Sequence, residues 1–155
     1  MNINELYQEV RKLNSDIQRI VSSSEIDYYD DMSGVDYNKT NPEEVFLFDE
    51  LYRIMEKLED VTHTIKYLEK PIRADGTLHK NHNGRYELQG IELTSGCGLE
   101  YLVCDEYHEI YCEDTDEYKK VPYWKASRID HKGTDYYIVG ANLDTLENVR
   151  VRIRK

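Results

Sequence analysis

Three cysteines and one histidine are the side chains whose spacing most suggests chemistry. Cys97 is followed by Cys104, His108 and Cys112, and three thiolates with one imidazole are a ligand set that zinc accepts. Residues four apart on a strand face the same side of a sheet. Structural zinc sites usually hold closely spaced cysteine pairs, however, and free cysteines are common in small cores. We therefore assign no metal and no cofactor, and zinc stays an open alternative.

Nucleophilic catalysis has little support in the sequence. A reactive cysteine needs a base and a cationic environment, whereas Cys104 and Cys112 lie among acids and Cys97 stands between two glycines. His79 and His82 read as parts of a polar turn. Carboxylates are abundant, but none has the spacing to a histidine or glycine loop that hydrolases or kinases require. The sequence predicts a protein that is not an enzyme.

Acidic side chains are unevenly distributed and point to a binding role. The chain has 31 acidic and 20 basic residues, for a net charge of −11. Residues 23–41 hold five acids against one base, and residues 105–120 hold seven against two. Such a field opposes general binding to nucleic acids, which need a cationic surface. It favours a basic protein partner, although acidity also serves plain solubility.

Tyrosines accompany these acids and supply contact area with a polar tip. The chain has 14 tyrosines, several of them inside the two acidic segments. Our hypothesis is that the chain is a non-catalytic accessory protein that binds a basic partner. In its narrowest form, the hypothesis is that the chain mimics nucleic acid and occupies the groove of a host defence nuclease. The predicted partner-binding residues are Asp27, Tyr28, Tyr29, Asp30, Asp31, Asp36, Glu43, Glu44, Glu109, Glu113, Asp114, Asp116 and Glu117.

The end of the chain gives an alternative. Its last strand alternates apolar residues with Arg150, Arg152 and Arg154, so one face would be cationic. With Trp124 and Arg128, that face could bind nucleic acid, the acids then limiting non-specific contacts.

Two heptad patterns predict two long helices in residues 1–69. The first spans residues 3–21 and the second residues 41–68, where Asn41 can cap the helix and Pro42 suits its first turn. Their apolar seams follow a 3–4 spacing, at Ile3, Leu6, Val10, Leu13, Ile17 and Ile20, and at Leu47, Leu51, Ile54, Leu58, Val61, Ile65 and Leu68. We expect an antiparallel coiled-coil hairpin with an acidic loop at residues 23–41. Because two seams bury little surface, the hairpin should also pack on the C-terminal part or on a second copy in a homodimer.

Residues 70–155 change to a period of two after Lys70-Pro71. Turn signals separate short apolar runs, which predict strands at residues 85–89, 91–93, 99–104, 124–131, 136–139 and 148–153. The fold class is therefore α+β, with a small antiparallel SH3-like β-barrel after the hairpin. The acidic insertion at residues 105–120 would project from it, as a hairpin or as a loop.

The β-rich part contains motifs that are similar to a known family. Gly84-Arg85-Tyr86, Glu92-Leu93 before Gly96, Leu99-Glu100, Trp124 before Arg128-Ile129, and Tyr136-Tyr137 fall within residues 76–140. Together they resemble a short domain of unknown function found in proteins of phages and mobile elements of Gram-positive bacteria. The resemblance implies an accessory gene on a mobile element and brings no catalytic residues.

Localisation follows from what the chain lacks. No apolar run approaches the 18 or so residues that cross a bilayer, and no signal peptide is recognisable. An odd cysteine count without a disulfide framework fits a reducing compartment. We expect a soluble, cytoplasmic protein that does not bind membranes.

Overall fold

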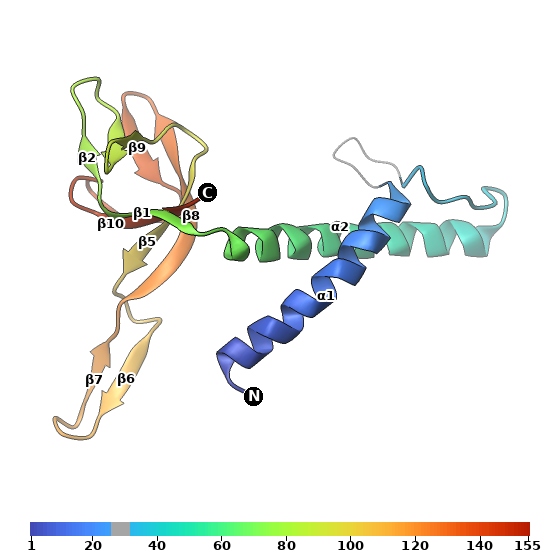
Figure 1. Ribbon diagram of the computed structural model, residues 1–155, viewed down its shortest axis with the longest axis horizontal. Helices are drawn as coiled ribbons and strands as arrows, with labels where there is room; N and C mark the ends of the chain where they lie inside the picture. The colour runs from blue at the N-terminus through green and yellow to red at the C-terminus, as the bar shows by residue number, and fades with distance from the viewer. Residues whose placement is uncertain (26–31) are drawn as a thin grey trace. The chain divides into compact units, whose positions relative to one another are not determined.

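A computed structural model describes residues 1–25 and 32–155 of the chain (Figure 1). These residues form two compact units, Met1–Lys70 and Pro71–Lys155, and each is described by itself. The first unit contains two helices and the second contains antiparallel sheets, so the predicted α+β class is confirmed. The elements are α1 (Ile3–Ser24), α2 (Pro42–Glu69), β1 (Ile72–Thr77), β2 (His79–Lys80), β3 (Tyr86–Leu88), β4 (Ile91–Glu92), β5 (Gly98–Val103), β6 (Glu109–Cys112), β7 (Glu117–Lys120), β8 (Tyr123–Lys132), β9 (Asp135–Ile138) and β10 (Arg150–Arg154).

Both helices begin at caps that satisfy their first N–H groups. The Asn2 side chain accepts from the N–H of Glu5 at 2.9 Å, and the Glu5 carboxylate accepts from the N–H of Asn2 at 2.8 Å, which makes a capping box. Asn41 accepts from the N–H of Glu43 at 3.1 Å, and Pro42 opens α2. Among the described residues, α1 and α2 included, no helix combines the length and the apolar composition that crossing a bilayer requires.

The two helices contact each other along a thin interface. Arg11 Nε lies 2.8 Å from Glu69 Oε1, which joins α1 to the end of α2. Few helical side chains are buried, and three of the five are polar: the buried positions of α1 and α2 are Asn14, Ser24, Met55, Thr62 and Ile65. Much of the predicted seam is exposed instead, so the coiled-coil hairpin stays a prediction.

Residues 32–41 fold back onto the helices. Met32 is buried in a cluster with Met55, and the rings of Tyr37 and Phe48 stack with centroids 4.1 Å apart. Gly34 donates its N–H to the carbonyl of Ser24 at 3.2 Å. This segment therefore covers the end of the helix pair where α1 finishes.

Replacing Gly34 by alanine is expected to destabilise the helical unit by about 1–3 kcal/mol. A Cβ at this position would lie 2.5 Å from the backbone oxygen of Ser23, so the loop or the helix end has to move. Thermal unfolding followed by helical circular dichroism measures the loss. Ser33→Ala, which removes only an exposed hydrogen bond to Glu25, is the control and should change stability by less than about 0.5 kcal/mol.

The β unit contains three antiparallel sheets. The largest has the strand order β1-β10-β5-β8-β9, the second has the order β2-β3-β4, and β6 pairs only with β7. β1 and β9 are the edges of the five-stranded sheet, so the pairing in the described residues does not close a ring. The SH3-like barrel accordingly stays a prediction. β1 and β2 were absent from the strands that the sequence predicted.

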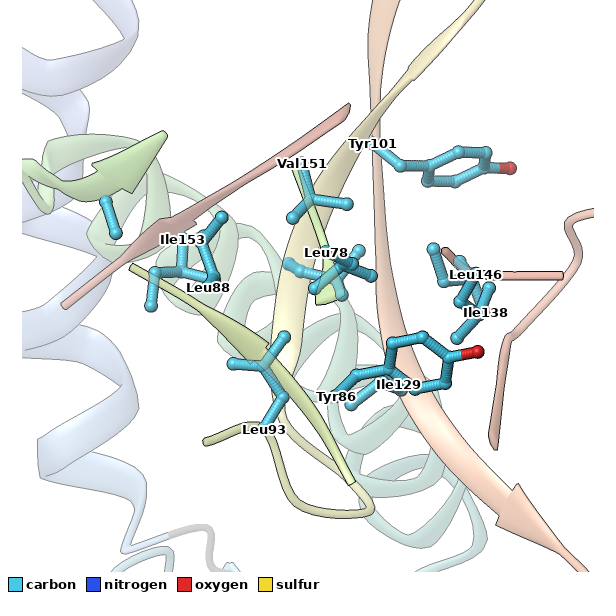
Figure 2. Packing of buried hydrophobic residues seen from close by; sticks show 12 residues of the cluster. Leu78, Tyr86, Leu88, Leu93, Tyr101, Ile129, Ile138, Leu146, Val151 and Ile153 are labelled. Carbon is cyan, nitrogen blue, oxygen red and sulfur yellow. The ribbon is translucent and has the colours of Figure 1, made fainter. Parts of the chain in front are cut away.

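One hydrophobic core joins the five-stranded and the three-stranded sheet. It contains twelve buried residues from both sheets and their connections. Leu78, Leu88 and Val151 lie at its centre, each with no exposed surface, and Figure 2 shows their side chains converging. On β10, Val151 and Ile153 point into this core while the arginines alternate on the other face, as the period of two predicts.

Candidate functional site

The β6–β7 hairpin is a two-stranded arm that projects from the β unit. Its register pairs Glu109 with Lys120 and Tyr111 with Tyr118. Cys112 is the only half-buried residue of the two strands, and the others are exposed. Figure 1 shows the arm extending away from the five-stranded sheet of the same unit. Of the two forms considered for residues 105–120, the structure therefore has a hairpin.

The turn of the arm is built from acidic residues. Residues 113–116 connect the strands, and the N–H of Thr115 donates to the carbonyl of Cys112 at 3.2 Å. Asp116 has a φ of 53°, a left-handed conformation that aspartate tolerates better than most residues because its short side chain can bond locally. The same residues that make the turn thus place negative charge at the tip.

The base of the arm is fixed to β8. Asp105 accepts from the N–H of Tyr107 at 3.0 Å and from the hydroxyl of Tyr123 at 3.2 Å. The rings of Tyr107 and Tyr123 lie 5.6 Å apart. Burial, and then the Asp105 carboxylate, raises the pKa of Tyr123. These contacts hold the first residues of the arm against the sheet.

Aromatic side chains line one face of the arm. Tyr111 and Tyr118 are cross-strand partners with ring centroids 5.3 Å apart. The Tyr111 hydroxyl donates to Asp116, and this hydrogen bond raises the pKa of Tyr111. Tyr118 is 70 % exposed and Tyr107 is 84 % exposed. The predicted site residues did not include these three tyrosines, although their position among acids at strand spacing was visible in the sequence.

The arm holds more carboxylates than basic side chains, five acids against two lysines in residues 109–120. Five were predicted as site residues, and all are exposed: Glu109, Glu113, Asp114, Asp116 and Glu117. None of the five forms an ion pair within the described part of the chain; the ion pair of this segment joins Lys120 to Glu106 at 3.3 Å. The arm therefore presents free negative charge beside exposed aromatic rings.

The other predicted acidic residues lie in the helical unit. Asp36 and Glu43 are exposed. Glu44 serves the local structure, since it accepts from the N–H of Asn38 at 2.7 Å and from the Asn41 side chain at 3.0 Å. A further five predicted residues lie outside the described residues: Asp27, Tyr28, Tyr29, Asp30 and Asp31. The structure thus gathers the arm residues into one surface of the β unit, while Asp36, Glu43 and Glu44 belong to the helical unit.

The arginines proposed for nucleic-acid binding have carboxylate partners in the same unit. Arg152 and Arg154 both donate to Glu100, the latter at 2.6 Å. Arg150 lies 2.8 Å from Asp75, and Arg128 lies 3.8 Å from Asp130. The guanidinium of Arg152 also stacks on the ring of Trp124, 4.4 Å from its centroid. The face is thus internally paired, and nucleic-acid binding by it stays a prediction.

Glu100 is the buried centre of that arginine face. It is 4 % exposed, and the register places it directly opposite Arg152 on β10. Burial alone raises the pKa of a carboxyl, but the hydrogen bonds from Arg154 and Arg152 and their charges outweigh it, so the pKa of Glu100 lies below its ordinary value. The group is charged and structural at neutral pH.

The structure gives no metal centre in the part of the chain that it describes, because no three or more His, Cys, Asp or Glu side chains gather as ligands. Cys97, Cys104 and Cys112 are free thiols. The spacing that suggested zinc therefore does not correspond to a collected ligand set.

Comparison with known proteins gives one match. Residues 76–153 match a family described as a domain of unknown function (DUF5348). The match covers slightly more than half of the chain and includes the arm, and it continues past residue 140 through most of β10. No curated protein and no solved structure matches the chain. The phage and mobile-element setting stays a prediction.

Proposed function

Because this chain belongs to the DUF5348 family, whose description assigns no activity, we propose from its own geometry that it is a non-catalytic binding module. Its β6–β7 arm docks onto a basic surface of another protein. The observation that carries the proposal is the arm itself, where free carboxylates and exposed tyrosines share one projecting hairpin.

The exposure of the arm supports this role. An isolated two-stranded hairpin is marginally stable in water. Among the described residues no further strand pairs with the arm, and Ile110, Tyr111 and Tyr118 are all at least 49 % exposed. A partner that covers these side chains would stabilise the hairpin and bury apolar surface that now faces water.

The chemistry of the arm suits an interface with a cationic protein. Tyrosine is enriched among the residues that contribute most to binding, because a large ring is buried while its hydroxyl still bonds. Carboxylates around such rings accelerate encounter and select partners of opposite charge. Tyr111 and Tyr118 are the expected centre of the contact, and the tip acids its rim.

In its narrower form, the proposal is that the partner is a nucleic-acid-binding enzyme, such as a host defence nuclease, and that the chain acts as a nucleic-acid mimic on a mobile element. The density of carboxylates at residues 113–117 supports this form. DNA should then compete with the arm for the partner.

Site-specific photo-crosslinking tests the arm. A benzophenone amino acid replaces Tyr118 in one version of the chain and Tyr137 in the other, since Tyr137 is also exposed but lies on β9. In cells that contain the partner, we expect a discrete adduct from position 118 and none from position 137. Neutralising Glu113, Asp114, Asp116 and Glu117 to Gln or Asn should reduce the adduct roughly tenfold, which corresponds to about 1.4 kcal/mol of binding.

The matched control removes the same number of charges elsewhere, at the exposed residues Asp49, Glu56, Asp60 and Asp144. It should leave the adduct unchanged, and both variants should keep the parent melting temperature within a few degrees. Equal adducts from positions 118 and 137, or equal losses in the two charge variants, would refute docking through the arm. An adduct that added DNA does not displace would remove the nucleic-acid-mimic form alone.

A further inference from the structure

We propose that the helical unit pairs with a second copy of itself, so that two α1–α2 hairpins form a four-helix bundle. The proposal concerns a surface that the arm does not use. That surface is an apolar stripe, defined by Leu6, Leu13 and Ile20 on α1 and by Leu47, Ile54 and Val61 on α2. All six are between 41 % and 59 % exposed.

The period of the stripe is that of helix-to-helix packing. Its members recur every seven residues on both helices, which keeps them on one side of a helix that packs against another over several turns. Scattered exposed leucines are ordinary, but a row with a heptad spacing on each of two helices is the pattern of a buried seam.

The two rows lie on the same side of the hairpin. Each stripe residue comes one position before a less exposed one: Leu13, Ile54 and Val61 precede buried residues, and Leu6, Ile20 and Leu47 precede half-buried ones. One residue is about 100° of rotation on an α-helix. Each stripe residue is therefore turned by about 100° from the residue that follows it and faces the other helix. Because α1 and α2 run in opposite directions, with Arg11 joined to Glu69, these turns have opposite senses and place both rows on the same side of the helix pair.

A groove at one end of the helix pair adds to the exposed apolar surface. It has a volume of about 300 Å³ and is lined by both helices, including Ile20 of the stripe and Leu51, with Met32 and Met55 beneath.

The helical unit needs this face to be covered. Met32, Met55 and Ile65 are its buried apolar residues among residues 1–25 and 32–70, whereas the β unit has a core of twelve buried residues. A unit of this size with so small a core is only marginally stable by itself. Burying the stripe would add six large aliphatic side chains to the core.

A second copy is the occupant that fits. From its first to its last residue the stripe is about 21 Å long on each helix, so a helical partner of heptad period matches it best. The exposed apolar residues of the β unit lie on strands of at most ten residues or on loops, and the described residues contain no third helix. A two-fold axis makes identical faces self-complementary.

Sedimentation of the full chain tests the proposal. From about 1 to about 100 µM the chain should sediment at twice its mass of 18.4 kDa, and the melting temperature of the helical signal should rise with concentration because dimerisation is linked to folding. Leu13→Glu and Ile54→Glu should each weaken the dimer roughly 100-fold. Ser15→Glu and His63→Glu, at exposed positions away from the stripe, should weaken it less than about threefold.

Fluorescence of Trp124 in the β unit shows whether each variant retains the rest of its fold. A chain that sediments as a monomer at every concentration would overturn the proposal. A melting temperature that does not depend on concentration would also overturn it, since the stripe would then be covered within the same chain. A dimer that the stripe variants disturb no more than the controls would place the interface elsewhere and overturn it as well.

Discussion

Replacing Glu100 by glutamine is expected to lower the free energy of unfolding of the β unit by about 3–5 kcal/mol. Glu100 is buried, and it accepts hydrogen bonds from both Arg152 and Arg154, whose side chains are themselves 19 % and 16 % exposed. Glutamine keeps the shape but removes the negative charge to which both largely buried guanidinium groups donate. Removing one member of such a cluster costs far more than the cluster contributes in total.

The pH dependence of this effect has a definite sign. The pKa of Glu100 is lower in the folded chain than in the unfolded chain, where a glutamate titrates near about 4.3. The stabilisation that the Glu100 carboxylate contributes is therefore present above that pH, and it is lost as the pH falls through the lower pKa that Glu100 has in the folded chain. The difference between the parent and the Glu100→Gln variant should accordingly shrink below about pH 4.

Urea unfolding followed by Trp124 fluorescence measures the effect, since this is the only tryptophan and it lies against Arg152. Glu106→Gln is the matched control, because Glu106 forms an exposed ion pair with Lys120. It should cost less than about 1 kcal/mol. A Glu100 variant no less stable than this control at neutral pH would show that the arginines do not depend on the carboxylate.

Replacing Leu88 by alanine should cost about 2–5 kcal/mol. Leu88 lies on β3 of the three-stranded sheet, has no exposed surface and belongs to the core shared with the five-stranded sheet (Figure 2). The cavity left by three missing carbons would be lined by residues of both sheets. The unfolding of this variant should remain one transition, because the two sheets share a single core and are expected to unfold together.

Leu102→Ala is the control for that change. Leu102 lies on β5 but is 39 % exposed, so the same truncation there should cost less than about 1 kcal/mol. Equal losses at the two positions, or two separate transitions in the Leu88 variant, would contradict a shared core. The same fluorescence measurement serves for both variants.

The arm shows how far the sequence reached toward the candidate site. Its acids were identified from composition alone, because seven carboxylates in sixteen residues are visible without a fold. Whether residues 105–120 make a hairpin or a loop depends on cross-strand pairing such as that of Tyr111 with Tyr118. Pairing is a property of two segments, so the importance of these tyrosines emerged only when their rings were placed.

The basic strand shows where sequence reasoning stops. The alternation of β10 correctly predicted one apolar and one cationic face. It could not reveal that Glu100, some fifty positions earlier, lies opposite Arg152. A charged side chain that has no partner nearby in sequence can meet an oppositely charged residue on the adjacent strand. Which residues meet depends on the strand register, and the register is decided by the whole sheet.

The sequence by itself determined the helices of this protein, the change to strands after Lys70 and the location of its acidic segments. Caps, heptad spacing and the period-two pattern are local, and each acts within a few residues. Only the tertiary structure decided which of two adjacent rows of side chains on each helix turns inward, since both rows repeat with the same period and the inward rows include the polar residues Asn14 and Thr62. It also decided which charges are neutralised, because the partners of a side chain come from whatever segments the fold brings beside it.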